Sequence, residues 1–285
     1  MLTRVVLASD QPIPADLLAL VPGEPKLRDT DFGHQATSII HVDDPARLRA
    51  GLLASAGPVA VGVITGRLAT EPAQLVMFDV DSTLTTTESI DLLADHAGRG
   101  PEVAAVTERA MRGELDFAAS LRERVATLEG LDAGVLADVA PRMDLSPGAR
   151  ALVSRLHDAK VYQGMTSGGF IQLVGPLAEE LGFEFASAND LEVALVDGEQ
   201  RLTGQVLGAI VDGEHKARDL EVFIEAVGAD PELTVAVGDG ANDIPMMDAA
   251  ALSIAYCAKP VTAQHADVAI NFSRLDAVAA FVLVD

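Results

Sequence analysis

The chain has 285 residues, of which 49% are apolar, which is enough to bury one large core or two unequal ones. It carries 20 basic against 43 acidic side chains, a formal net charge of −23, and lacks a basic run that could follow a phosphate backbone, so neither nucleic acid nor a membrane is an expected partner. A single cysteine, Cys257, excludes an internal disulfide, and the lack of a signal peptide or of a bilayer-length apolar stretch predicts a cytoplasmic protein.

Residues 1–72 are expected to form a small, separate α/β domain. Its predicted strands are three short apolar runs, at residues 5–7, 38–40 and 59–64. A helix is predicted to begin at Asp44 and to bury one stripe of leucines: Leu48, Leu52 and Leu53. Nothing in this part of the chain has catalytic spacing.

Residues 73–285 are expected to form a larger domain in which strands alternate with helices. The predicted strands are five apolar runs, at residues 75–80, 160–166, 233–237, 252–257 and 267–272. This alternation predicts an α/β fold, a Rossmann-like parallel sheet with helices on both faces. Ligands of such sheets bind outside the carboxyl ends of the strands, where Asp79, Ser167 and Asp239 stand. Cys257 ends an apolar run, and we expect its thiol to be buried.

Two insertions interrupt the alternation. Residues 88–146 show only helical patterns directly after the first strand, which predicts a helical cap able to act as a lid. In the second insertion, Asp197-Gly198 stands between alternating residues and predicts a β-hairpin.

Asp79 and Asp81 follow an apolar run and precede two hydroxyl residues. On a strand, residues two apart point to the same side, so both carboxylates would face one site. A carboxylate can attack phosphorus, and a second acid can protonate the departing oxygen and then deprotonate water. The alternative is that the two acids only cap a turn.

The run from Gly238 to Asp243 follows another strand and holds three oxygen-bearing side chains, those of Asp239, Asn242 and Asp243. Such hard oxygen donors suit Mg²⁺. The alternative is a tight turn in which Asn242 caps the next helix.

Two further positions could bind an anion. Ser167 and Gly168 end a strand at a predicted helix start, where a hydroxyl and free N–H groups form an anion site; a simple helix cap is the alternative. Lys216 lies in the first turn of a predicted helix and opposes its dipole, which favours a role on phosphate over a solvated lysine.

In the cap, Arg124 shares an apolar helical stripe with Phe117. A cation there needs a partner, either a substrate carboxylate or an internal salt bridge with neighbours of Glu123 or with Glu88. Met111 and Phe117 are read from the pattern alone as core side chains.

Together these motifs resemble the four signatures of the haloacid dehalogenase superfamily: residues 79–83, residues 167–169, Lys216 and residues 238–243. The closer resemblance is to the phosphoserine phosphatases of that superfamily. It lies in Glu88 and in three stretches at residues 110–117, 120–125 and 255–260, and the whole match covers residues 74–272.

The resemblance implies Mg²⁺-dependent hydrolysis of O-phospho-L-serine to serine and phosphate, the last step of serine biosynthesis. It implies that Asp79 is the nucleophile that becomes an aspartyl phosphate and that Asp81 is the acid and base. The implied metal ligands are Asp79, Asp239 and the backbone carbonyl of Asp81, with Asp243 holding Lys216 or a metal-bound water.

The resemblance also implies how the substrate is held. Four residues would bind its phosphate: Ser167, Gly168, Lys216 and Asn242. Glu88 would receive the ammonium and Arg124 the carboxylate, while Met111 and Phe117 would exclude water.

Two other functions stay open. The same chemistry could act on another small phosphomonoester or transfer the phosphoryl group to an alcohol. Alternatively, the chain could be a non-catalytic amino-acid sensor working through residues 1–72, which loosely resemble an ACT-like regulatory domain. The sequence also leaves open whether the chain forms a homodimer.

Overall fold

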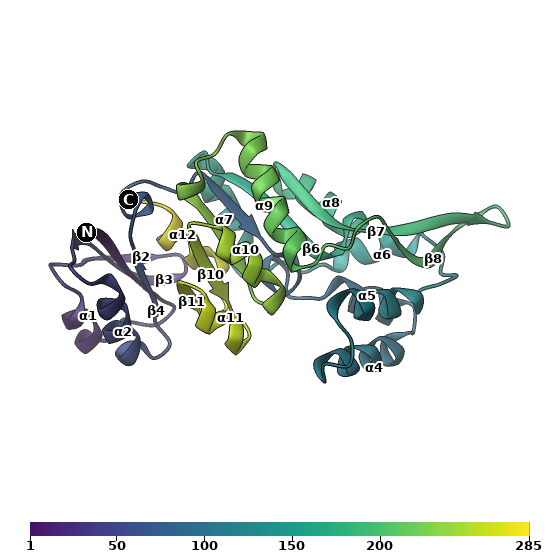
Figure 1. Ribbon diagram of the computed structural model, residues 1–285, viewed down its shortest axis with the longest axis horizontal. Helices are drawn as coiled ribbons and strands as arrows, with labels where there is room; N and C mark the ends of the chain where they lie inside the picture. Colours follow the sequence, from purple (N-terminus) through teal and green to yellow (C-terminus); the bar gives the residue numbers. More distant parts are fainter. Residues whose placement is uncertain (285) are drawn as a thin grey trace.

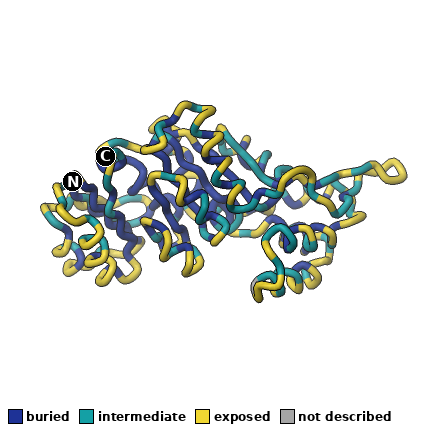
Figure 2. Tube along the Cα trace, in the orientation of Figure 1, coloured by how far each residue is buried: buried dark blue, intermediate teal, exposed yellow. Residues whose placement is uncertain are grey.

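The structure, a computed structural model, describes residues 1–284, and the side chain of Met111 lies outside the described part. Figure 1 shows a small sheet at one end of an elongated molecule, a larger sheet in the middle, and a helical cap with a long hairpin at the other end. Buried residues fill the two sheets, the cap contains a mixture of buried, intermediate and exposed residues, and the hairpin tip is exposed (Figure 2).

The small sheet is antiparallel, with four strands in the order β2-β3-β1-β4. Its strands are β1 (Leu2–Ser9), β2 (Lys26–Thr30), β3 (Gly33–His41) and β4 (Ala60–Ile64). Two helices, α1 (Ala15–Leu20) and α2 (Pro45–Ala56), cover one face. The sequence predicted β1, β3, β4 and α2, but it missed α1, which is short, and β2, whose residues are almost all exposed and lack apolar alternation.

Helix α2 begins as predicted, because the Asp44 side chain accepts a hydrogen bond from the Arg47 N–H. Its apolar stripe was partly wrong: Leu52 is buried, but Leu53 is 43% exposed. Consecutive helical residues are rotated by about 100°, so Leu52 and Leu53 do not face the same side.

The second face of the small sheet packs on the C-terminal helix α12 (Ala279–Val282). The buried Arg4 guanidinium donates to the carbonyls of Leu68 and Phe281, at 2.9 and 2.7 Å. A Cβ at Gly62 would lie 2.7 Å from the Phe281 ring, so the ring needs glycine beneath it. The small sheet is therefore tied to the rest of the molecule by packing and by backbone hydrogen bonds.

The central sheet has seven strands in the order β11-β10-β9-β5-β6-β7-β8, and all neighbours are parallel except β7 and β8. The strands are β5 (Leu75–Phe78), β6 (Tyr162–Phe170), β7 (Phe185–Val196), β8 (Glu199–Leu207), β9 (Thr234–Gly238), β10 (Leu252–Tyr256) and β11 (Val268–Ile270). The helices between them are α7 (Ala149–Asp158), α8 (Ile171–Leu181), α9 (Gly213–Val227), α10 (Ile244–Ala249) and α11 (Pro260–His265).

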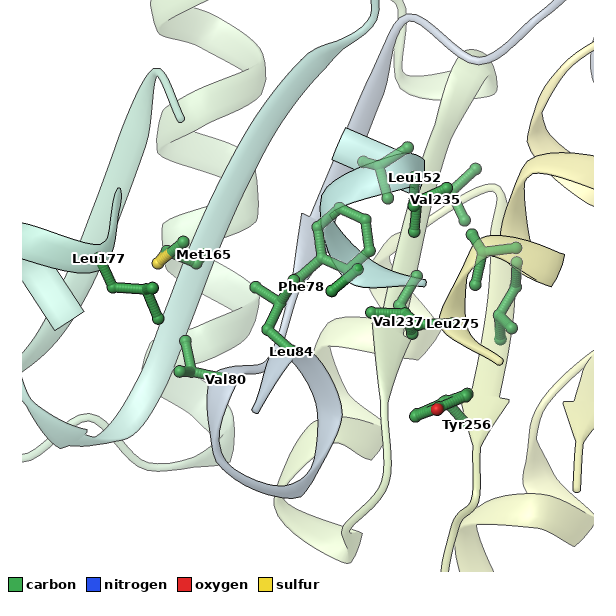
Figure 3. Close-up of a cluster of buried hydrophobic side chains, with 14 of the residues drawn as sticks. Phe78, Val80, Leu84, Leu152, Met165, Leu177, Val235, Val237, Tyr256 and Leu275 are labelled. Atoms are coloured by element: carbon green, nitrogen blue, oxygen red, sulfur yellow. The ribbon is translucent and has the colours of Figure 1, made fainter. Parts of the chain in front are cut away.

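The two faces of β5 belong to different cores, as the predicted α/β fold requires. Phe78 packs with Leu152 of α7, Val235 and Val237 (Figure 3), whereas Met77 packs with side chains of α9 and α10. Strand β5 is apolar on both sides because helices cover both faces of the sheet.

Both predicted insertions are present. The first holds the helices α3 (Ser89–His96), α4 (Gly100–Met111), α5 (Phe117–Ala126) and α6 (Val135–Val139). The second is the β7–β8 hairpin, which turns at Asp197 and Gly198 with φ values of 52° and 87°. Its first strand begins earlier than predicted, at Phe185, and there pairs in parallel with β6. The sequence did not reveal this part because residues 185–189 are mostly small or polar.

The expectation of a buried Cys257 was wrong. Strand β10 ends at Tyr256, and Cys257 takes a left-handed conformation with φ 44° that leaves it exposed. Across the described residues, none of the helices combines the length and the hydropathy that crossing a bilayer requires.

Candidate active site

Three neighbouring strands, β9, β5 and β6, bring the candidate residues to one edge of the central sheet. Asp79 directly follows β5, Asp239 directly follows β9, and Ser167 lies near the end of β6. Because these strands are parallel, their carboxyl ends meet at the same edge, as the sequence predicted.

Asp81 reaches this edge by a different route from the one predicted. Strand β5 ends at Phe78, and residues 80–84 form a tight turn with Ser82 at φ 62°. The turn, not the alternation of a strand, therefore sets the direction of the Asp81 side chain. Oδ2 of Asp81 accepts a hydrogen bond from the Ser89 hydroxyl at 2.8 Å.

Lys216 links two of the acids. It is fully buried in the first turn of α9, and its Nζ donates to Oδ1 of Asp79 at 2.5 Å and to Oδ1 of Asp243 at 2.7 Å. Burial works against its charge, but the carboxylates of Asp243 and Asp79 outweigh burial and raise the pKa of Lys216. The two carboxylates therefore stabilise the charged form of the ammonium, and because Lys216 is fully buried, the alternative of a solvated lysine is wrong.

The loop after β9 is organised around Asp243. Its buried carboxylate accepts the backbone N–H groups of Asp239 and Gly240 through Oδ2, at 3.1 and 2.9 Å. A Cβ at Gly238 would lie 2.5 Å from the Asp243 carboxyl carbon, so this approach requires glycine. Asn242 lies half-buried in the same loop and caps neither the short 3-10 turn nor α10.

Asp79, Asp239 and Asp243 form a carboxylate cluster whose contributing oxygens all lie within 4.8 Å of one another. Burial and the neighbouring Asp243 hold the pKa of Asp79 well above its usual range, and burial raises the pKa of Asp239 to about 6. Among the described residues, Lys216 forms ion pairs with Asp79 and Asp243 alone, so three clustered carboxyl groups share one directly bonded ammonium. A divalent cation would add positive charge there, and the oxygen donors suit a hard ion.

The predicted ligand set and this cluster differ by one residue. Asp243 is in the cluster, but both of its oxygens already accept hydrogen bonds, from Lys216 and from backbone N–H groups. The side chain of Asp81 is outside the cluster. Asp79 and Asp239 are therefore the side chains best able to hold a metal.

Ser167 and Gly168 lie inside a strand, because β6 continues to Phe170 and α8 begins at Ile171. The predicted helix-start anion site is therefore displaced into the strand end. The buried Ser167 Oγ accepts the Gly169 N–H at 2.9 Å. A Cβ at Gly168 would lie 2.8 Å from the Phe117 ring, so the cap helix α5 packs directly over this strand end.

Arg124, also on α5, is half-buried. Its Nε donates to the Ser120 carbonyl at 3.4 Å, and it forms no ion pair within the described part of the chain. Burial lowers the pKa of its guanidinium, although the charges of Glu88, Asp91 and Asp81 oppose that effect. The predicted alternative of a salt bridge to Glu88 is not formed.

Glu88 is exposed just before α3, and its carboxylate accepts the Ser82 hydroxyl at 3.0 Å. Met111 belongs to α4, but its side chain is outside the described residues. Ser89 is the site residue that the sequence did not reveal, because a serine at a helix start is most simply read as a cap.

The comparisons with known proteins agree with this geometry. The family model of haloacid dehalogenase-like hydrolases matches residues 76–248. A phosphoserine phosphatase of Streptomyces coelicolor is 48% identical over 235 residues, which make up 82% of this chain and 56% of that protein, so the chain spans little more than half of its length.

Two solved structures are similar. One is a haloacid dehalogenase family hydrolase from Salmonella enterica, with TM-score 0.86 and 24% identity over 99% of this chain and 98% of the other, which supports the fold alone. The other is a phospho-aspartyl intermediate analogue of phosphoserine phosphatase, with TM-score 0.68 and 38% identity over 75% of this chain and all of the other. The sheet, the acidic loop and the buried lysine therefore have a common explanation: this chain belongs to the haloacid dehalogenase-like hydrolases.

Proposed function

We propose that the chain hydrolyses O-phospho-L-serine to L-serine and phosphate, the last step of serine biosynthesis, through an aspartyl phosphate on Asp79. The observation that carries this proposal is the contact of the buried Lys216 ammonium with Asp79 and Asp243, next to Asp239. The names of the S. coelicolor relative and of the phospho-aspartyl structure support the substrate and the intermediate.

In the first step a carboxylate oxygen of Asp79 attacks phosphorus, and the bond from phosphorus to the serine oxygen breaks. Asp81 gives its proton to that oxygen, so serine leaves as an alcohol. In the second step Asp81 takes a proton from water, the water oxygen attacks phosphorus, and the bond to Asp79 breaks. Phosphate leaves, and both acids return to their starting states.

Charge neutralisation and positioning supply most of the rate in phosphoryl transfer. Mg²⁺, held by the carboxylates of Asp79 and Asp239 and by the carbonyl of Asp81, would offset the repulsion between an anionic ester and an anionic nucleophile. Lys216 adds a fixed positive charge beside Asp79. The phosphate oxygens would be bound by four residues: Ser167, Gly168, Lys216 and Asn242.

The cap would recognise the rest of the substrate. Arg124 presents a guanidinium without an ion-pair partner among the described residues, which suits a carboxylate, and Glu88 presents an exposed carboxylate, which suits an ammonium. Phe117, packed over Gly168, would exclude water, and we assign the same role to Met111.

The division of the chain is also a proposal. Residues 1–72 would be a small regulatory domain, and residues 73–285 would be the phosphatase domain with a cap at about 88–146. We propose a cytoplasmic enzyme that acts on a small molecule and not on nucleic acid. Calorimetry of the full chain with serine would test regulation by serine, with binding beyond one site per chain expected because serine is also the proposed product; without a heat signal, serine is not the regulator.

A panel of phosphoserine, phosphothreonine and sugar phosphates, each with Mg²⁺ and with EDTA, tests the function. We expect phosphoserine to react fastest, EDTA to abolish the reaction, and Asp79→Asn to be inactive. A faster reaction with a sugar phosphate would favour another phosphomonoester as substrate. Phosphoserine hydrolysis by Asp79→Asn at a near wild-type rate would contradict the mechanism.

A further inference from the structure

The turn after β5 folds back onto the start of the cap through two side-chain hydrogen bonds. The Ser89 hydroxyl donates to Asp81 Oδ2 at 2.8 Å, and the Ser82 hydroxyl donates to Glu88 Oε1 at 3.0 Å. Each carboxylate in this pair is thus held by a serine from the opposite segment. The bond to Asp81 is the one that bears on the reacting centre.

The Ser89 hydroxyl is closely confined. Ser89 is fully buried at the first position of α3. Across from it, a Cβ at Gly169 would lie 2.2 Å from Ser89 Oγ and 3.0 Å from Asp81 Oδ2. Any residue other than glycine at position 169 would therefore push the hydroxyl or the carboxylate away. The absence of a side chain at Gly169 leaves space for the Ser89 hydroxyl between β6 and the Asp81 carboxylate.

The two oxygens of Asp81 have different surroundings. Oδ2 is the acceptor of the Ser89 hydrogen bond. Oδ1 is also buried, but it has no hydrogen-bond partner among the described residues. A hydroxyl that donates to one carboxyl oxygen makes that oxygen an acceptor, so the proton of a neutral carboxyl group belongs on the other oxygen.

We propose that Ser89 is a positioning residue that holds Asp81 by Oδ2, so that Oδ1 carries the proton given to the leaving oxygen and later receives the proton of water. This inference rests on the proposed phosphatase function. Ser89 itself forms and breaks no bond to the substrate. Because Ser89 begins the first cap helix, it also ties the orientation of the acid to the position of the cap.

The leaving group of the substrate should determine how much the rate falls when the Ser89 hydroxyl is removed. Without it, the terminal torsion of Asp81 is less restrained, because rotation about that bond is soft, although the backbone N–H of Ser89 still interacts with the carboxyl group. Phosphoserine needs the proton, since serine leaves poorly as an alkoxide. p-Nitrophenyl phosphate does not, since nitrophenolate is a stable anion. The rate should therefore fall more with phosphoserine, which is an alkyl ester, than with p-nitrophenyl phosphate.

The experiment compares wild type with Ser89→Ala in the full chain, in saturating Mg²⁺, on both esters. With phosphoserine we expect kcat to fall by about 10- to 100-fold with KM changed less than about threefold. With p-nitrophenyl phosphate, the rate constant of the pre-steady-state burst of nitrophenolate should change less than about threefold. Equal losses on both esters, or no loss on phosphoserine, would overturn the inference.

A double-mutant cycle tests whether Ser89 acts through Asp81. In an Asp81→Asn background, Ser89→Ala should change kcat for phosphoserine by less than about twofold, although alone it lowers that kcat by about 10- to 100-fold. A further tenfold loss in that background would show that Ser89 acts by another route and would overturn the inference. Ser89→Thr keeps the hydroxyl and should restore the wild-type ratio of kcat for phosphoserine to the burst rate constant for p-nitrophenyl phosphate. A ratio like that of Ser89→Ala would count against the proposal.

Ser253→Ala is the matched control. It removes another serine hydroxyl that donates to an aspartate at 2.8 Å, Ser253 Oγ to Asp267 Oδ2, near the start of β10 and away from the site. We expect its ratio between the two esters to match wild type. A wild-type chain that hydrolyses neither ester would end the proposed function and this inference together, whereas an active wild type with equal losses in Ser89→Ala would end the inference alone.

Discussion

The two halves of the candidate site are built differently. On the core side, Asp79, Lys216 and Asp243 are buried and bonded to one another. On the cap side, Glu88 and Arg124 are not paired with each other and keep contact with solvent. The core half is arranged before a ligand arrives, whereas the cap half has charges that a zwitterionic ligand would neutralise. Chemistry and selectivity should therefore respond separately to mutation.

The largest effect should come from the nucleophile. Asp79→Asn removes the attacking oxyanion, so we expect kcat to fall by about 10⁴- to 10⁶-fold with every phosphomonoester. Phosphate release under saturating Mg²⁺ would measure it. The exposed Asp10→Asn is the matched control and should keep wild-type activity. A loss of activity confined to phosphoserine would mean that Asp79 affects selectivity, which would contradict the assignment of chemistry to the core half and of selectivity to the cap half.

Removing the buried cation should destabilise the core half. Lys216→Met leaves Asp79 and Asp243 buried without their shared partner, so we expect the free energy of unfolding to fall by about 3–5 kcal/mol. Urea unfolding would measure it. Lys26→Met, at an exposed position of β2, should stay within about 0.5 kcal/mol of wild type. Equal stabilities for the two variants would mean that the Lys216 contacts are not maintained in solution.

Selectivity should depend on the cap half. Arg124→Ala should lower kcat/KM for phosphoserine by about 10²-fold but leave O-phosphoethanolamine nearly unchanged, since that ester has the ammonium without the carboxylate. Arg122→Ala removes an exposed arginine from the same helix and should change neither value more than about twofold. If Arg124→Ala slows both esters equally, Arg124 does not read the carboxylate.

The smallest effect should be a pH dependence of the metal-free protein. Burial raises the pKa of Asp239 to about 6 and that of Asp81 to about 7, above the ~3.9 of an unfolded aspartate. The folded state then retains protons that the unfolded state has lost, so stability from these groups should fall as pH rises from about 4 to about 7, by on the order of 1–3 kcal/mol.

Thermal unfolding in EDTA at pH 5.5 and pH 7.5 would measure that fall, and Mg²⁺ should recover most of it at the higher pH because the metal replaces the protons. Asp239→Asn should reduce the pH dependence. Metal-free stability that rises across this interval would contradict the raised pKa values of Asp239 and Asp81.

The sequence predicted the positions of the core residues well, but it did not predict the contacts between the turn after β5 and the start of the cap. Asp79, Asp239 and Lys216 were found because each stands at the end or start of a strongly periodic element. The route to Asp81 was predicted wrongly, because strand β5 ends at Phe78, two residues earlier than predicted, and the chain then enters the turn that contains the left-handed Ser82. Ser89 was missed because its partner lies in a turn whose path no local pattern specifies.

By itself, the sequence determined the strand–helix alternation, the helical cap, the hairpin turn and most of the polar residues that the structure gathers at the candidate site. These are local properties, carried by apolar periodicity, glycines and the side chains themselves. Only the tertiary structure decided which residues meet: Lys216 touches Asp79 and Asp243 across 137 and 27 positions of the chain, and Ser89 meets Asp81 under Gly169. Such contacts depend on strand order and close packing, which are set by the whole chain and not by any short segment of it.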